Sequence, residues 1–228
     1  MHLRDLTHFL SELKNNNHRA WFVMNRPRYD ILRTEFLDTV TQLIAAIAVF
    51  DPEVRHCNPK KALFRINRDV RFSSNKEPYK TVFSAAIVPK DLRRPSEGGG
   101  PCYYMHIDGE GKLHFGGGEY MPPAHRLRGI RQHIVADPDG FEKVLQNNTL
   151  RDVYGALQEE HKLMRVPKPY DAASPHAEYL KLKSFFVWAE IPLQLNAPEQ
   201  LLPDLVSNFK AALPLISWLR QTPSGEGN

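Results

Sequence analysis

The stretch from Arg65 to Thr81 reads Arg-Ile-Asn-Arg-Asp-Val-Arg-Phe-Ser-Ser-Asn-Lys-Glu-Pro-Tyr-Lys-Thr. These residues include three arginines and two lysines but only two acids. Guanidinium groups suit the recognition of phosphate and carboxylate groups, and an ordinary solvated surface seldom needs so many of them in one place. The stretch is therefore the first candidate both for a defining structural element and for a binding site.

Residues 62–72 are expected to be extended, and alternation along a strand would give them two faces. One face holds Phe64, Ile66, Val70 and Phe72 with Arg68 among them, and the other holds Arg65, Asn67, Asp69 and Arg71. Asp69 would then lie between two arginines. Arg68 would lie on the apolar side, where an unpaired charge is costly. We therefore expect either a turn near Asn67 or a partner for Arg68 in a half-buried site.

Helical periodicity dominates the chain before this stretch. Apolar residues recur every three or four positions in a short helix and again in a long helix that Pro27 opens. Asn15–Asn17 and Asp51-Pro52 are typical helix ends. The short helix would bury Leu6, Phe9, Leu10 and Leu13, and the long helix would bury Tyr29, Leu32, Phe36, Val40, Leu43 and Ile47.

Strand patterns follow the stretch, and helical patterns return after them. Strands are expected at Val82–Val88, Cys102–Ile107, Lys112–Phe115 and Phe185–Ile191, with a hairpin turn at Asp108–Gly111 and a loop at 91–101. Helices are expected from Pro122, over Asp137–Leu145, from Ser174-Pro175 and over Leu202–Leu213, the last after a capping box at Asn196 and Glu199. Pro214 should kink or end that helix, and residues 150–173 should be irregular.

This order of elements predicts an α+β fold with helices packed on an antiparallel or mixed sheet. It does not match the strand–helix alternation of a parallel sheet. No repeat or long linker divides the chain, so a single domain is expected over residues 1–222. Residues 223–228 are expected to form a flexible tail.

The basic character of the chain is local. Residues 55–94 carry a net charge of +8, whereas the remainder of the 228-residue chain carries −4. A local positive field suits an anionic partner such as a phosphate, a carboxylate or a nucleic acid. A solvated basic face with internal ion pairs would give the same charge balance, so this alternative stays open.

Several classes of protein do not fit the sequence. The longest apolar run, Leu43–Phe50, is too short to span a bilayer, and the first residues lack the apolar core of a signal peptide. Cys57 and Cys102 form neither a disulfide framework nor a metal-binding spacing. We expect a cytoplasmic protein that has no membrane partner, no metal site and no cofactor.

A candidate anion site can be drawn from three parts of the chain. Its ligand-binding members would be Arg65, Arg68, Asp69, Arg71, Lys76, Tyr79 and Lys80, together with the backbone N–H groups of Gly116, Gly117 and Gly118. Asn16, Trp21 and Asn25 would support it. Each part also has an ordinary structural interpretation: turn or bulge glycines, a core tryptophan, and asparagines that cap helices.

No catalytic constellation is evident. Asp69 is the best candidate acid or base, but an acid between arginines has a lowered pKa and is a poor base at neutral pH. His106 and His114 share a face only if the hairpin register brings them together, and with Glu119 they would give an unspecific metal spacing. We interpret both histidines as structural residues.

Three segments together resemble an uncharacterised, mainly bacterial family known as domain of unknown function 2461. They are Asn16–Phe22 with Asn25 and Tyr29; Phe64–Ser73 with Lys76 and Pro78–Thr81; and Gly116–Gly118 with Tyr120 and Pro122. Asn75 departs from the pattern, since similar proteins usually carry an acid there. The resemblance implies a single α+β domain and no particular activity.

Three functions fit these observations, and the placement of the arginines separates them. Arginines that line one concave pocket would indicate a ligand that is phosphorylated or carboxylated, which we rank first. Arginines spread over a convex face with exposed aromatic side chains would indicate nucleic-acid binding, and arginines each paired with an acid would indicate a scaffold or interaction protein. We also expect the three segments of the resemblance to converge in space.

Overall fold

The computed structural model describes residues 1–71, 74–90 and 100–222. Phe72, most of the predicted 91–101 loop and the predicted tail at 223–228 lie outside the described residues. Within the described part, no helix is long and apolar enough to cross a membrane.

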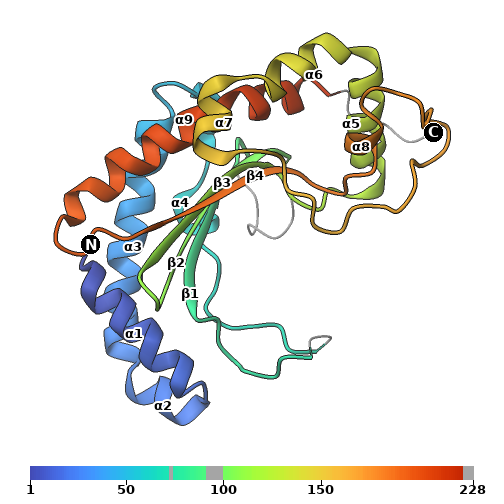
Figure 1. Cartoon of the computed structure of the whole chain (residues 1–228). Coiled ribbons are helices and arrows are strands. Elements are labelled where there is room, and N and C mark those ends of the chain that lie inside the picture. Colours follow the sequence, from blue (N-terminus) through green and yellow to red (C-terminus); the bar gives the residue numbers. More distant parts are fainter. Residues whose placement is uncertain (72–73, 91–99, 223–228) are drawn as a thin grey trace. The chain divides into compact units, whose positions relative to one another are not determined.

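Four strands form one antiparallel sheet in the order β1-β2-β3-β4. They are β1 (Val82–Ile87), β2 (Cys102–Asp108), β3 (Lys112–Glu119) and β4 (Phe185–Pro192). The β2–β3 hairpin turns where the sequence predicts it. The Asp108 carboxylate closes this turn by accepting the N–H groups of Glu110 at 2.9 Å and Lys112 at 3.0 Å. The predicted α+β class with an antiparallel sheet is therefore confirmed (Figure 1).

The residues group into two compact units. The first unit comprises residues 1–99, 104–115 and 190–207, and the second comprises residues 100–103, 116–189 and 208–228. Strands β2, β3 and β4 each contribute residues to both units, and so does the last helix, α9 (Leu201–Arg220). The chain is therefore a single α+β domain, while its predicted boundary at residue 222 stays a prediction.

The N-terminal helices of the first unit bury the side chains that periodicity selects. These helices are α1 (Leu3–Asn15), α2 (Arg19–Met24) and α3 (Arg26–Ile47), followed by a 3₁₀ turn at Pro52–His56 and by α4 (Pro59–Ala62). All the apolar residues predicted for the short and the long helix are buried. Helix α3 packs on β1, since the rings of Tyr29 and Phe36 lie 5.7 and 5.5 Å from the ring of Phe83.

The basic stretch forms an arm that leaves the sheet and returns to it (Figure 1). Isolated antiparallel bridges join Leu63 to Ala85 and Asn67 to Tyr79. We call residues 64–68 and 78–81 the inner arm, and residues 69–71 and 74–77 the outer arm. The extended segment begins at Leu63 and not at residue 62, because Asn58 caps α4 by accepting the N–H groups of Lys60 and Lys61.

The predicted two faces of the arm are confirmed over its described residues. Phe64, Arg68 and Val70 are half-buried and Ile66 is buried, whereas Arg65, Asn67, Asp69 and Arg71 are exposed. No turn breaks the strand near Asn67, since the Arg68 N–H donates to Pro78 O at 2.8 Å and the Lys80 N–H donates to Ile66 O at 2.7 Å. The alternative expectation, a half-buried Arg68 with a partner, is therefore confirmed.

The second unit contains α5 (Ala124–Ala136), α6 (Pro138–Leu145), α7 (Asn148–Tyr154) and α8 (Ala177–Leu180). Two sequence-based expectations are corrected here. Residues 150–154 are helical and not irregular, because Asn147 caps α7 by accepting the Leu150 N–H at 3.0 Å. Helix α8 begins at Ala177 with His176 at its N-cap position, so Ser174 and Pro175 lie before the helix.

Helix α9 continues through Pro214 to Arg220, so the alternative that the helix ends at Pro214 is wrong. Proline removes one backbone hydrogen bond, but Leu205, Phe209, Leu215 and Ile216 on this helix are fully buried. Their burial outweighs the loss of one bond. The predicted capping box is also wrong. A 3₁₀ turn at Pro198–Gln200 precedes the helix, and the Asn196 side chain accepts a hydrogen bond from Arg4 instead.

Candidate functional site

Asn17, on the connection between α1 and α2, holds the root of the arm. Its Nδ2 donates to Tyr79 O at 3.0 Å, and its Oδ1 accepts the Tyr79 N–H at 3.0 Å. The Tyr79 ring is buried and stacks on Phe22 with the ring centroids 4.1 Å apart. Two of the three segments of the resemblance therefore meet. Gly116–Gly118 belong to the second unit, and their convergence with the arm stays a prediction.

The three predicted supporting residues have structural contacts. Asn16 ends α1 and donates from Nδ2 to Glu12 O at 2.9 Å, and Asn25 donates to Trp21 O at 3.0 Å. The Trp21 ring is half-buried, with its centroid 5.7 Å from that of Phe9. These contacts fix the corner of the chain from which Asn17 reaches the arm.

The outer arm neutralises much of its own charge. Arg71 donates from Nη2 to Asp69 Oδ2 at 2.8 Å and from Nε to Asp69 Oδ1 at 3.0 Å. These hydrogen bonds lower the pKa of Asp69 to about 2. Lys76 donates from Nζ to Val70 O at 3.0 Å. Asp69 is thus the ion-pair partner of an arginine, which makes it a poor base at neutral pH.

The inner arm has a different balance of charge. Arg68 reaches Tyr79 O at 3.4 Å from Nη2, and its ion pair within the described residues is a 3.8 Å contact with Glu77. Its Nε is buried and has no hydrogen-bond partner within residues 1–71, 74–90 and 100–222. Such a donor is uncommon in a folded protein, since nearly all buried polar groups are paired.

Lys80 and Arg65 extend this positive region. The Lys80 Nζ lies 5.0 Å from the centroid of the Phe64 ring. Burial lowers the pKa of Lys80, and the charges of Arg65 and Arg68 lower it further. Arg65 is exposed and makes no hydrogen bond or ion pair with any residue that the structure describes. We call Arg65, Arg68 and Lys80 the cation cluster.

The glycines of β3 provide room for β4 and α9. A Cβ atom on Gly116 would lie 2.2 Å from Val187 O, and one on Gly118 would lie 2.2 Å from Phe185 O. Gly118 also has a φ of +123°, which favours glycine. At Gly117 a Cβ would lie 2.7 Å from the Ala212 side chain. Strand β3 therefore continues to Glu119 and does not end at Phe115, because only glycine fits between these neighbours.

Half-buried polar side chains line one face of the β2–β3 hairpin in the first unit. The Tyr104 hydroxyl lies 3.3 Å from His106 Nδ1, and the rings of His106 and His114 stack with their centroids 4.1 Å apart. His114 faces Asp108 at 3.0 Å and Glu190 at 3.4 Å. We call Tyr104, His106 and His114 the Tyr–His strip. Burial, followed by the proximity of His114, lowers the pKa of His106 to about 4.

Sequence reasoning missed Asn17 as an anchor and Tyr104 as a site residue. The contact of Asn17 joins positions 62 residues apart, so no local pattern signals it. Tyr104 shares the strand parity of His106, so alternation along the predicted strand would have found it. Glu119 belongs to the second unit, where both its oxygens accept hydrogen bonds from Arg126 at 2.9 and 3.1 Å. The described residues contain no group suited to hold a metal ion.

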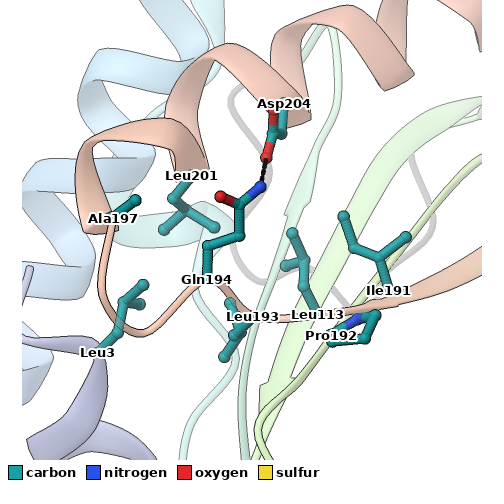
Figure 2. Close-up of a pocket in the computed structure, with 9 residues that line it drawn as sticks. All are labelled: Leu3, Leu113, Ile191, Pro192, Leu193, Gln194, Ala197, Leu201 and Asp204. Atoms are coloured by element: carbon teal, nitrogen blue, oxygen red, sulfur yellow. Dashed lines mark hydrogen bonds between the residues drawn. The ribbon is translucent and has the colours of Figure 1, made fainter.

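Two hollows in the first unit contain none of the predicted site residues. Figure 2 shows a narrow cavity of about 10 Å³, in which Gln194 donates to Asp204 at 3.4 Å and most of the other lining side chains are apolar. It has room for about one water molecule. An open hollow lies along α3 and α4, lined by Leu37, Asp38, Thr41, His56, Asn58, Pro59 and Lys60. Neither brings charged groups together as the arm does.

The family resemblance is borne out by comparison with known proteins. No curated protein and no solved structure gives a significant match to the chain. The profile of a family described as "Conserved hypothetical protein (DUF2461)" matches residues 5–218, which is nearly the whole chain and includes the arm and the Tyr–His strip. The chain therefore belongs to the conserved hypothetical protein family DUF2461.

Proposed function

We propose that the cation cluster binds an anionic small molecule through a phosphate or carboxylate group. The observation that carries the proposal is the buried Nε of Arg68, which has no hydrogen-bond partner in the described part of the chain. A phosphate or carboxylate oxygen would give this donor a charge-assisted hydrogen bond. It would also relieve the repulsion among Arg65, Arg68 and Lys80 that contributes to the lowered pKa of Lys80.

The two kinds of side chain suit different parts of such a ligand. A guanidinium offers a planar fork of donors that matches two oxygens of one anionic group, whereas an ammonium acts as a compact charge. In the proposed complex Arg68 binds oxygens of the anion, and Lys80 and Arg65 add nearby positive charge. Asn17 fixes the backbone of Tyr79, and therefore the position of the neighbouring Lys80, before the ligand arrives.

The test is thermal unfolding with and without phosphate or carboxylate compounds at millimolar concentration. A ligand at about 100 times its dissociation constant adds roughly 2.7 kcal/mol to the free energy of unfolding. Lys80→Gln should remove most of the resulting rise in Tm. Lys90→Gln removes the same charge from an exposed lysine of the same unit and should leave the rise intact. An equal response in both variants would count against a specific site.

Nucleic-acid binding is the second candidate, because the arm leaves the sheet (Figure 1). Arg65 and Arg71, which share strand parity, are both exposed. This candidate ranks lower since Asp69 already neutralises Arg71. Micromolar oligonucleotide binding that increases with strand length at physiological salt would reverse the ranking. A chain that responds to neither anions nor oligonucleotides would be better described as a scaffold or interaction protein.

A cytoplasmic location is part of the proposal. Neither Cys57 nor Cys102 forms a disulfide within the described residues, and reduced cysteines are typical of proteins from reducing compartments. The check is to locate a fluorescent fusion of the full chain in cells. Fluorescence outside the cytoplasm would contradict this part of the proposal.

A further inference from the structure

The cation cluster and the Tyr–His strip meet at one aromatic ring. The Lys80 Nζ lies 5.0 Å from the centroid of the Phe64 ring, and the centroid of the Tyr104 ring lies 6.0 Å from the same point. Lys80 Nζ and the centroid of the Tyr104 ring are therefore no farther apart than the sum of these distances. Phe64, Lys80, Tyr104 and His106 are all half-buried. A single small molecule with its anionic group at the cluster can reach the strip.

The hydrogen-bond donors and acceptors of the Tyr–His strip determine which chemical groups suit the part of the ligand that lies against it. A hydroxyl has one donor and two acceptor positions, and a neutral imidazole has one of each. The low pKa of His106 keeps its imidazole neutral at neutral pH. Beyond His106, His114 faces the carboxylates of Asp108 and Glu190, and Glu190 is also bound by Lys112 at 2.7 Å. A second anionic group would meet these carboxylates.

An apolar group would fit no better. It would cover the Tyr104 hydroxyl and the His106 imidazole without offering hydrogen bonds, and covering polar groups in this way costs free energy. Hydroxyl groups on the ligand can both donate to and accept from these side chains. Of the three kinds of substituent, the hydroxyl is the one that suits the strip.

We propose that the ligand of the cation cluster is a hydroxylated anion, of the sugar phosphate or sugar acid class, whose hydroxyl groups bind Tyr104 and His106. The inference rests on the proposed function, because the cluster must first hold the anionic group. Tyr104 and His106 are then the residues that determine specificity. Arg65, Arg68 and Lys80 supply the charge, which any anion of the right size would use.

Two matched pairs of probes test the inference by titration calorimetry with the full chain. Ribose 5-phosphate is compared with butyl phosphate, and gluconate is compared with hexanoate, so that each pair differs mainly in hydroxyl groups. In at least one pair the hydroxylated compound should bind about tenfold more tightly, as one or two good hydrogen bonds allow. The pair that responds identifies the anionic group as a phosphate or a carboxylate.

Variants separate the strip from the cluster. Tyr104→Phe and His106→Phe keep aromatic rings and should lower the affinity for the hydroxylated probe to that of its plain partner, while leaving the plain partner unchanged. Lys80→Gln should weaken both probes. Tyr120→Phe removes a hydroxyl from an exposed tyrosine of the second unit and should change neither.

A spectroscopic readout covers the case in which a variant is poorly folded. In the wild-type chain, the ring-proton resonances of His106 should move with the hydroxylated probe and stay in place with the plain one. Equal affinity for both members of each pair, with no such movement, would overturn the inference and leave the proposed function standing. No binding of any of the four probes would overturn both.

Discussion

The outer and the inner arm both carry basic side chains, but the two parts differ in how closely these side chains are paired with carboxylates. In the outer arm, two hydrogen bonds join Arg71 to Asp69 and leave little positive charge for a ligand. In the inner arm, the described ion pair of the cation cluster is the 3.8 Å contact of Arg68 with Glu77, and Asp69 interacts with Arg65 through its charge. A count of arginines therefore says little about anion binding until the acids within reach are known.

The two parts of the arm also differ in how firmly the rest of the protein holds them. Asn17 makes two hydrogen bonds to the backbone of Tyr79, and Phe22 stacks on its ring, so the inner arm is fixed to the N-terminal helices. The outer-arm contacts of Arg71, Asp69 and Lys76 join neighbours within the arm. A rigid inner arm suits a site whose charges must be in place before the ligand binds.

The largest expected effect is on the anchor of the inner arm. Asn17→Ala leaves the N–H of Tyr79 without its partner, and leaves the Tyr79 C=O with the 3.4 Å hydrogen bond from Arg68 alone, in a half-buried position. The loss should lower the free energy of unfolding by roughly 2–3 kcal/mol in urea denaturation. Asn75→Ala in the exposed outer arm should cost less than about 0.5 kcal/mol. Equal losses in the two variants would contradict the difference between an inner arm that Asn17 fixes and an outer arm without such an anchor among the described contacts.

A smaller effect should appear on lowering the pH. The pKa of His106 in the folded chain is about 4, below its ordinary value of 6.5. The unfolded chain therefore binds more protons between these pH values, and the free energy of unfolding falls as pH drops from about 6.5 to about 4. The full shift is worth roughly 3 kcal/mol, and about 2 kcal/mol is expected because His106 is partly exposed.

The outer arm responds in a different pH range. The pKa of Asp69 is lowered to about 2, so the contribution of its ion pair is present above its ordinary value of 3.8 and is lost only as pH falls toward 2. Urea denaturation at pH 7, 5.5 and 4 checks the histidine part, with His106→Phe as the control. If the free energy of unfolding of the variant falls as much as that of the wild type over this pH range, the pH dependence arises from groups other than His106.

Whether the sequence could predict a contact of the arm depends on how far apart in the chain the two contacting residues lie. Strand parity places Arg65, Asp69 and Arg71 on one face and Arg68 on the other, because alternation is a local property of the backbone. The pairing of Asp69 with Arg71 follows from their spacing of two residues. The predicted apolar faces of α1 and α3 are confirmed for the same reason, since helical periodicity is also local.

Contacts between distant segments could not be predicted in this way. Nothing near Asn17 indicates that its amide holds Tyr79, and nothing near Gly116 indicates that β4 will approach its backbone. Pro214 misled the sequence reasoning because its local cost is outweighed by the burial of apolar side chains along α9. The position of Tyr104 beside Phe64 likewise depends on how the arm joins the sheet.

A third expected effect is small and concerns the two arginines directly. Arg68 is among the groups that lower the pKa of Lys80, whereas Arg71 is not. Arg68→Gln should therefore raise the pKa of Lys80, and Arg71→Gln should leave it unchanged. Side-chain NMR of Lys80 over alkaline pH checks this. A larger rise of the Lys80 pKa in the Arg71 variant would show that the cation cluster is assigned to the wrong residues.

The smallest effect is expected in the outer arm itself. Arg71→Gln removes an exposed ion pair, which is typically worth less than about 1 kcal/mol and often nothing measurable. The Tm of this variant should be close to that of the wild type. A loss comparable with that of Asn17→Ala would mean that the outer arm supports the fold, and the contrast between the two parts would fail.

The most direct test of the central claim is to follow the Nε–H resonances of the arginine side chains by NMR while phosphate or a carboxylate is added. We predict that the Arg68 resonance moves and saturates, because this donor binds the anion. The Arg71 resonance should stay in place, because Asp69 already holds it. Movement of Arg71 without Arg68, or no movement of any arm arginine with either anion, would contradict the account.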